Sequence, residues 1–256
     1  MVGVDRERIG AGRPTFVTSE TLVTKTTCIL DARAARHMRV LRLDAGTVVG
    51  LRDGHGGIAE GHVIRLTKSQ AHVDVQDVAH REPLPAVHLL IPVADKDRML
   101  WLAEKAGELS CTSWRPVLWR RSRSVTSRGE GMSFQTRVRA RMEGALAQSE
   151  GAWLPQLFPD ANVERALLAA PTGDRIVLDP GGDPLVGRNA PPLSGPLTLA
   201  IGPEGGIEDD ELAALERAGF RRASLGATIL RFETAAIAAL AMARTALTTP
   251  SEPSIT

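Results

Sequence analysis

Hydrophobic positions follow two different patterns along this chain, and the first occupies its N-terminal third. In residues 71–76 apolar and polar side chains alternate, which is typical of a strand with one buried and one solvated face. Residues 47–51 and 58–66 predict two more strands, joined by the glycine-rich hairpin signal at 53–57. Residues 31–38 are rich in alanine and arginine and predict a short helix. We therefore expect a small antiparallel sheet or barrel in this region.

The second pattern begins after the proline-containing segment 81–85 and alternates apolar runs with amphipathic stretches. Residues 87–93 predict a buried strand, and residues 95–109 predict a helix with one apolar face. Further strand–helix pairs are predicted at 117–119 with 136–148 and at 157–158 with 163–170. This alternation predicts a mostly parallel sheet with helices on both faces. We therefore expect two domains, residues 1–82 and residues 83–256.

Glycine-containing loops follow three of the predicted strands in the second domain. The strand at 175–179 runs out into Pro180 and two glycines, and the strand at 199–201 breaks into the glycine-rich loop 202–206. A third apolar run starts at Leu225 and breaks at the next residue, which is also a glycine. Such loops meet at one edge of a parallel sheet, where glycines let the backbone approach a flat ligand. The alternative for any one of these loops is an ordinary tight turn.

Composition limits the class of protein without naming a function. The chain has 256 residues, of which 43% are hydrophobic, and a formal net charge of +1, so we expect a globular protein that does not coat nucleic acid through overall charge. The first residues are charged and no apolar run is long enough to span a bilayer, so we expect a soluble cytoplasmic protein without a membrane partner. Cys28 and Cys111 lack metal-ligand or disulfide spacing, so we expect buried thiols and no metal site.

Arginine is concentrated in two parts of the chain. Eight arginines lie between residues 115 and 141, against the single acid Glu130. The planar guanidinium suits phosphate contacts, so this cluster predicts an RNA contact surface, although a solvated helix face beside a mobile loop is the alternative. In the first domain three more arginines lie three apart and can share one exposed helical face, unless they are ordinary surface charge. These candidates are Arg120, Arg121 and Arg123 in the cluster and Arg36, Arg39 and Arg42 in the first domain.

Two helices near the C-terminus have distinct characters. Four acidic residues at 208–211 crowd the first turn of one helix, which Gly219 closes, so we interpret that turn as structural. The last helix, residues 232–247, is apolar on nearly all sides and must be covered by its own domain or by a second chain. Neither a P-loop nor a dinucleotide-binding glycine motif is present in the sequence.

Two C-terminal segments carry a family resemblance. The sequence IGPEGG at 201–206, followed by LGATILRFETA at 225–235, resembles the signature of the SPOUT methyltransferases, most closely the bacterial enzymes that methylate N3 of a uridine in 16S ribosomal RNA. Residues 13–17 and 37–46 resemble segments of the PUA-like RNA-binding domain of that family. The resemblance implies a small PUA-like β-barrel, then a parallel sheet threaded as a trefoil knot, in a homodimer with active sites at the subunit interface.

The resemblance also implies a cofactor, a substrate and site residues. The cofactor is S-adenosylmethionine, and the partner is 16S ribosomal RNA of the small ribosomal subunit, contacted by Arg13 together with the arginines named above. Arg231 is expected to stabilise negative charge on the uracil, while Glu204 or Glu233 accepts a proton or holds Arg231 in place. No metal is needed, because the cofactor carries no phosphates. The residues expected to hold it are Leu178, Asp179, Pro180, Gly181, Ile201, Gly202, Pro203, Gly205, Gly206, Leu225, Gly226, Ile229 and Leu230.

Three positions depart from the family pattern. Ser110 stands where relatives have a helix-ending glycine, which puts the turn there in question. Ala147 and Gly151 stand where an acid and an arginine are usual, so substrate choice or activity could differ. Two alternatives to the uridine-N3 enzyme therefore remain open. One is a SPOUT methyltransferase acting on another RNA, and the other is a non-catalytic RNA-binding or ribosome-assembly protein with the same fold.

Overall fold

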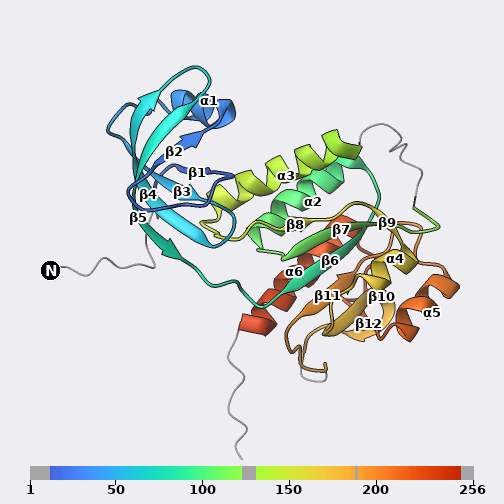
Figure 1. Ribbon diagram of the computed structural model, residues 1–256. Coiled ribbons are helices and arrows are strands. Elements are labelled where there is room, and N and C mark those ends of the chain that lie inside the picture. Colours follow the sequence, from blue (N-terminus) through green and yellow to red (C-terminus); the bar gives the residue numbers. More distant parts are fainter. Residues whose placement is uncertain (1–11, 123–130, 188–189, 249–256) are drawn as a thin grey trace, which may run out of the picture. The chain divides into compact units, whose positions relative to one another are not determined.

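The computed structural model of the chain describes residues 12–122, 131–187 and 190–248 (Figure 1). The chain groups into two compact units, one of residues 1–83 with 143–154 and one of residues 84–142 with 155–256. Residues 143–154, which the sequence analysis assigned to the second domain, thus group with the first unit. Backbone carbonyls of this segment accept hydrogen bonds from the first unit: the Gly56 N–H donates to the Ala152 carbonyl (2.9 Å) and Arg52 Nε donates to the Gly151 carbonyl (3.1 Å).

A curled five-stranded sheet forms the first unit, as the alternating pattern predicts. Its elements are β1 (Thr15–Val17), β2 (Thr27–Leu30), α1 (Ala32–Val40), β3 (Val48–Arg52), β4 (Gly57–Leu66) and β5 (Ala71–His80). The strand order is β1-β3-β4-β5-β2, and every pairing is antiparallel except that of β1 with β3. Its core includes Phe16, Leu30, Met38, Leu51 and Val73, so α1 packs on the sheet through Met38.

The hairpin between β3 and β4 is organised by one buried carboxylate. Asp53 is 6% exposed, and its Oδ1 accepts from the N–H groups of His55 (2.8 Å) and Gly57 (2.9 Å), while Oδ2 accepts from the Leu22 N–H (3.4 Å). A Cβ at Gly57 would lie 2.1 Å from Asp53 Oδ2, so this close approach requires glycine. The expected hairpin is confirmed, and its turn depends on side-chain capture of backbone donors.

The second unit is a parallel sheet with helices on both faces. Its strands are β6 (Val87–Pro92), β7 (Ser113–Leu118), β8 (Gln156–Leu157), β9 (Ala161–Asn162), β10 (Asp174–Pro184), β11 (Leu197–Ala200) and β12 (Arg221–Ser224). Its helices are α2 (Lys96–Glu108), α3 (Gly131–Gln148), α4 (Val163–Leu168), α5 (Asp209–Arg217) and α6 (Phe232–Thr248). The strand order is β12-β10-β11-β6-β7-β8, with β9 also pairing β7, and all pairings are parallel.

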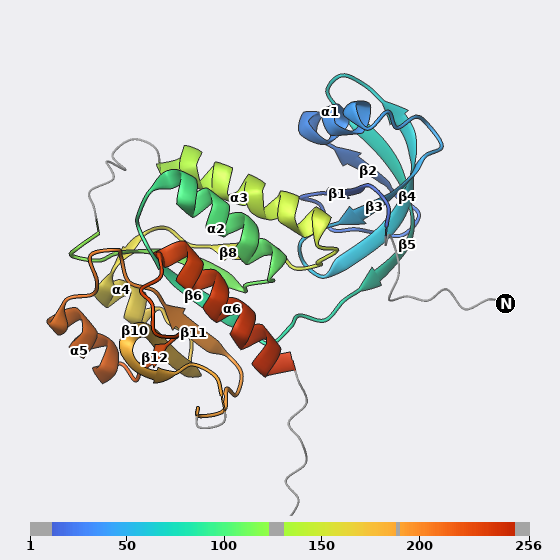
Figure 2. The same ribbon diagram turned by 180° about the vertical axis from the view of Figure 1, so that it is seen from behind.

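Different helices cover the two faces of this sheet. On one face α6 contacts β6, β11 and α2, as Figure 2 shows, and α3 is joined to α2 by the ion pair of Arg141 with Glu104 (3.1 Å). On the other face Leu212 and Leu215 of α5 and Ala166 of α4 share a buried cluster with strand residues. The expected class, a parallel α/β sheet preceded by a PUA-like curled sheet, is confirmed. The trefoil knot stays a prediction.

Two expectations about strands are wrong, one about where a strand ends and one about where a strand lies. The strand expected to end at Asp179 continues to Pro184, because β12 keeps pairing with β10 across an irregularity between Leu178 and Asp183. The apolar run at Leu225 is loop, and the strand before it is β12. Of the residues in β12 only Ala223 is buried, since β12 lies at the edge of the sheet, so its pattern carries no hydrophobic run.

Candidate active site

Three loops meet in one pocket at the carboxyl edge of the parallel sheet. The pocket has a volume of about 360 Å³ and lies between residues 178–180 of β10, the loop 201–207 after β11, and residues 223–230 at the end of β12. Phe232 and Ala235 of α6 complete its wall. The expected meeting of the loops is therefore present. Of the residues expected to hold a cofactor, those that line this pocket are Leu178, Asp179, Pro180, Ile201, Gly202, Pro203, Gly205, Gly206, Leu225, Gly226, Ile229 and Leu230.

Gly181 is the one expected cofactor residue that does not line the pocket. Its N–H donates to Asp179 Oδ1 (2.7 Å), so it shapes the loop that presents Asp179. Gly226 has a φ of +139°, a conformation that side-chain-bearing residues rarely adopt, so glycine is required for this loop to follow the pocket wall.

The lining of this pocket suits a flat ligand that carries positive charge. Among the residues that the structure describes, the charged side chains that line it are the two carboxylates Asp179 and Glu204, with no lysine or arginine. Leu178 and Ile201 supply apolar walls, and Ile229 is 90% exposed at the rim, where a ligand can cover it. A sulfonium- and ammonium-bearing nucleoside fits this lining, whereas the phosphates of a nucleotide would find no cation.

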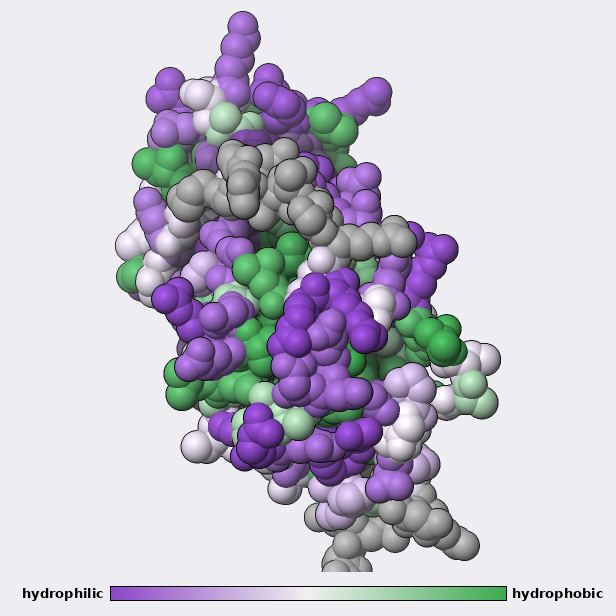
Figure 3. Space-filling view, turned by 90° about the vertical axis from the view of Figure 1, so that its right-hand side faces the viewer, coloured by the Kyte–Doolittle hydropathy of each residue, from purple (hydrophilic) through white to green (hydrophobic). Residues whose placement is uncertain are grey.

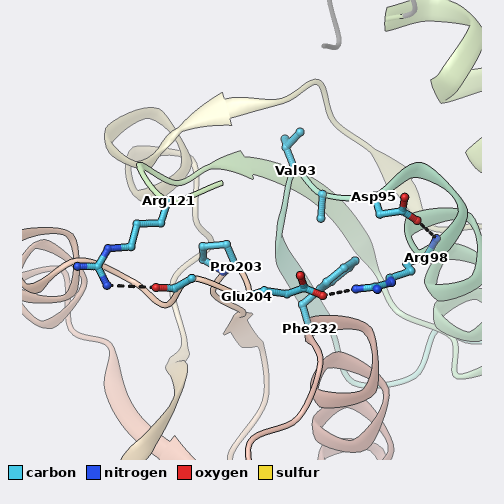
Figure 4. Close-up of a pocket in the computed structure, with 9 residues that line it drawn as sticks. Val93, Asp95, Arg98, Arg121, Pro203, Glu204 and Phe232 are labelled. Carbon is cyan, nitrogen blue, oxygen red and sulfur yellow. Dashed lines mark hydrogen bonds and ion pairs between the residues drawn. The ribbon is translucent and has the colours of Figure 1, made fainter. Parts of the chain in front are cut away.

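A second, smaller pocket of about 220 Å³ adjoins the first along the same edge. The two share Phe232 and the loop 203–205, and the second pocket is completed by residues 93–95 at the end of β6 and by Arg98 and Arg121. Figure 4 shows Arg98 and Arg121 approaching the loop from opposite sides. The two pockets are therefore neighbours at the carboxyl ends of the strands. The first lies at the ends of β12, β10 and β11, and the second at the ends of β11, β6 and β7.

The carboxylates expected to hold Arg231 contact a different arginine. Glu204 forms a close ion pair and hydrogen bond with Arg98, and Glu233 Oε1 lies 3.9 Å from Arg98 Nε. Arg231 itself is exposed and lines neither pocket. Arg98 was not among the expected site residues, although Asp95, which caps the helix α2 by accepting from the Arg98 N–H (3.1 Å), lies two residues after a predicted strand. That position at a strand's carboxyl end was the available signal.

A set of ion pairs fastens the loop after β7 to the first turn of α5. Arg120 pairs with Glu208 (2.6 Å) and Asp210, and Arg121 Nε lies 3.4 Å from Glu208 Oε1. These contacts raise the pKa of Arg120 and lower that of Asp210, mainly through the hydrogen bond between the two. Glu208 and Glu211 form the capping box of α5, so the structural interpretation of the acidic turn is confirmed. Arg123 lies outside the described residues.

A third pocket lies next to these ion pairs. A groove of about 670 Å³ runs between α4 and α5, lined by Leu118 at the end of β7 and by Leu167 and the 82% exposed Leu168 of α4. On the face that carries α4 and α5, hydrophobic side chains lie directly beside strongly hydrophilic ones (Figure 3). This groove therefore lies mainly between two helices, beside the end of β7.

The arginine candidates of the first unit are not equivalent. Arg13 pairs with Glu60 (2.8 Å), and Arg39 donates to the Lys68 carbonyl (3.1 Å). Arg36 is exposed on α1. The expectation that Arg42 shares this helical face is wrong, because α1 ends at Val40 and Arg42 has a φ of +56°.

None of the three departures from the family pattern lines either pocket. Ser110 keeps the left-handed backbone of a helix-ending glycine, with a φ of +54°. Ala147 and Gly151 line neither pocket, and both belong to the segment that groups with the first unit. The missing acid and arginine thus leave the lining of these pockets unchanged.

Other features narrow the chemistry further. Among the residues that the structure describes, no three His, Cys, Asp or Glu side chains gather where they could hold a metal ion. Over the same residues no helix is long and apolar enough to cross a membrane. Both cysteines are buried, as expected, and burial raises the pKa of the Cys111 thiol to about 12, so this thiol is not a nucleophile.

Comparison with known proteins places this arrangement in a family. The chain matches the family model described as RNA methyltransferase domain over residues 80–244, and the one described as RNA methyltransferase PUA domain over residues 30–76. It is 32% identical over 227 residues to Ribosomal RNA small subunit methyltransferase E of Mycobacterium bovis, with 85% of this chain and 86% of that protein covered.

Two solved structures have the same fold. A ribosomal RNA small subunit methyltransferase E from Neisseria gonorrhoeae, bound to S-adenosyl methionine, has a TM-score of 0.82 at 26% identity and covers 91% of this chain and 97% of its own. A methyltransferase from Legionella pneumophila with bound SAM has a TM-score of 0.84 at 25% identity and covers 91% and 98%. The chain therefore belongs to the RNA methyltransferase family that includes the ribosomal RNA small subunit methyltransferase E proteins.

Proposed function

We propose that this protein transfers a methyl group from S-adenosylmethionine to N3 of a uridine in 16S ribosomal RNA of the small ribosomal subunit. The observation that carries the proposal is the meeting of three strand-end loops in one pocket, whose described lining has two carboxylates and no cationic side chain. Family membership supports the class of reaction. Intact loops in that pocket argue against the non-catalytic alternative.

In this proposal the chain's residues bind and orient the two reactants. Backbone of the loops 178–180, 201–206 and 225–230 holds the cofactor, which supplies an electrophilic methyl group on its sulfonium. Asp179 offsets its positive charge. N3 of uridine is protonated when neutral, so the site must also favour loss of that proton and align N3 with the methyl carbon.

We propose that RNA contacts both units. The side chain of Arg36 on α1 is exposed to solvent. The depressions along the parallel sheet of the second unit offer room for a single strand of RNA. Arg13, Arg39 and Arg120 already have protein partners, so phosphates must compete for them. Binding should therefore weaken steeply as salt concentration rises.

We propose that the protein works in the cytoplasm as a homodimer that uses part of α6. The apolar residues of this helix that remain only partly buried within one chain include Ile237, Ala238, Ala241 and Met242. Sedimentation velocity of the purified protein should give the mass of two chains. A single-chain mass at micromolar concentration would remove the dimer from the proposal.

The test of the reaction uses small ribosomal subunits from cells that lack the modification. Incubation with the protein and labelled S-adenosylmethionine should transfer label, and mass spectrometry of nuclease fragments should locate one methyl group on N3 of a uridine. Subunits that already carry the modification serve as the control and should take up no label. A methyl group on another base or on ribose would redirect the assignment, and binding of S-adenosylmethionine without any transfer would favour the non-catalytic alternative.

A further inference from the structure

The second pocket has the size and lining of a site for one flat ring. Its apolar surface comes from Val93, Pro203 and the ring of Phe232, and its charged groups include Arg98 and Glu204. At about 220 Å³ it is smaller than the cofactor pocket, with which it shares the loop 203–205 and Phe232. Enzymes that modify a base take it out of the stack and hold it between apolar side chains and polar groups that read its edge.

Arg98 is held so that its guanidinium points into this pocket (Figure 4). Its backbone N–H is fixed by the Asp95 cap of α2, and its guanidinium contacts Glu204 and lies 3.9 Å from Glu233. Glu233 is 7% exposed, and its Oε2 has no hydrogen-bond partner among the described residues. The amino terminus of α2 adds positive potential at the same place. An anionic ring would therefore be stabilised beside Arg98.

We infer that the second pocket receives the target uracil and that Arg98, not Arg231, is the catalytic cation, donating hydrogen bonds to a uracil carbonyl while Glu204 takes the N3 proton. This inference rests on the proposed function and deepens it. Arg98 lines the pocket between two carboxylates, whereas Arg231 is exposed and lines neither pocket.

In this step the uracil exchanges its N3 proton for the methyl group. The N3–H bond breaks and its proton moves to the Glu204 carboxylate, leaving the negative charge on the uracil ring. The N3 electron pair forms a bond to the methyl carbon as the carbon–sulfur bond breaks, and that bond's electrons remain on sulfur as a neutral thioether. The proton then passes from Glu204, whose side chain is 39% exposed, to water.

The ion pair of Arg98 with Glu204 links the two roles. When Arg98 shifts a hydrogen bond to the uracil carbonyl, Glu204 loses a stabilising donor and becomes a stronger base. Entry of the ring thus activates the base and supplies the charge stabilisation together. Glu233 remains beside Arg98 and retains the guanidinium in the pocket.

The test compares Arg98→Ala with Arg222→Ala, a matched control whose guanidinium pairs with Glu216 (2.7 Å) on the surface of the same unit. Arg98→Ala should lower the rate of methyl transfer to unmodified small subunits about 10²–10³-fold, while affinity for S-adenosylmethionine measured by calorimetry changes less than about 3-fold. Added guanidinium ion should restore part of the lost rate. The rate of Arg98→Ala should also rise more steeply with pH than that of the wild type, because N3 loses its proton without assistance.

A second variant keeps the inference testable if Arg98→Ala folds poorly. Glu204→Gln preserves shape, and it should bind S-adenosylmethionine normally and lose transfer activity that higher pH partly restores. Activity of Arg98→Ala within about 2-fold of wild type, or loss of cofactor binding together with activity, would overturn the role of Arg98. Inert wild-type protein on unmodified subunits would instead reject the proposed function, and this inference with it.

Discussion

At the residue scale, the turn after α2 depends on one buried arginine and one unfavourable backbone conformation. The guanidinium of Arg244 donates to the carbonyls of Leu109 (3.0 Å), Ser110 and Pro85, and burial lowers the pKa of Arg244. Ser110 holds a φ of +54° between these contacts. The carbonyl contacts compensate for the strain that a side chain brings to this conformation.

Replacing Ser110 by glycine should stabilise the protein by about 1 kcal/mol, because glycine adopts this conformation without the steric cost of a Cβ. Ser110→Ala keeps the Cβ and is the matched control, with an expected change below about 0.5 kcal/mol. Urea unfolding of the three proteins measures the difference. Equal midpoints for Ser110→Gly and the wild type would show that the turn is not strained.

A half-buried histidine near the same arginine gives the stability a pH dependence. Burial, and secondarily the charge of Arg244, hold the pKa of His88 below its ordinary value of 6.5, and its Nδ1 lies 2.8 Å from Ser113 Oγ. Below about pH 6.5 the unfolded chain therefore binds a proton at His88 that the folded chain refuses, so the free energy of unfolding falls as pH falls.

His88→Gln should remove this contribution. Between about pH 7.5 and about pH 5.5 the wild type should lose more stability than the variant in urea unfolding. His72→Gln, at the half-buried histidine of β5 in the first unit, is the matched histidine-to-glutamine control. Parallel slopes for wild type and His88→Gln would mean that His88 titrates normally.

At the element scale, the β3–β4 hairpin depends on the carboxylate of Asp53. Asp53→Ala removes the acceptor of three backbone N–H groups and should cost about 3 kcal/mol of unfolding free energy. Asp31→Ala, which removes the N-cap of α1, is the comparison and should cost about 1 kcal/mol. A cost for Asp53→Ala no larger than that of Asp31→Ala would show that other contacts hold the turn.

Most elements could be predicted from sequence because burial leaves a periodic signal. The helix α2 and the strands β6 and β11 have such signals, and their expected positions agree with the structure within a few residues. The strand β12 could not be found this way, because an edge strand buries little and Ala223 is its one buried residue. The extension of β10 depends on pairing with β12, which no local pattern encodes.

The backbone loops of the candidate site could be predicted from sequence, whereas the ion pairs between its side chains could not. Glycines after apolar runs indicated the loops of the first pocket. The partner of Glu204 could not be inferred, since Arg98 lies 106 residues earlier in the sequence and meets it only through the pairing of β6 with β11. Arg231 stands in the recognisable motif but lies outside both pockets.

At the scale of the whole molecule, the first unit depends on a segment encoded far from the rest of it. Trp153 donates from Nε1 to the Arg81 carbonyl (2.8 Å) and packs edge-on against His80, with ring centroids 5.7 Å apart. A fragment of residues 84–256 retains Trp153 without these partners. Chymotrypsin should therefore cleave the fragment after Trp153 much faster than it cleaves the full chain.

The buried Trp119, 3% exposed in the core of the second unit, serves as the internal control and should resist cleavage in both proteins. Mass spectrometry of the early products gives both rates. Equal rates at Trp153 in fragment and full chain would mean that the segment needs no contact with the first unit.

The same arrangement affects how the molecule is made. During translation the N-terminal sheet leaves the ribosome first, yet its last segment follows only after residues 84–142 have emerged. Domains commonly fold as units in the order of synthesis. Here the N-terminal unit cannot complete its fold until residues 84–142 of the second unit and then residues 143–154 have been synthesised. Until then Arg52 and Arg81 lack their carbonyl acceptors at Gly151 and Glu150.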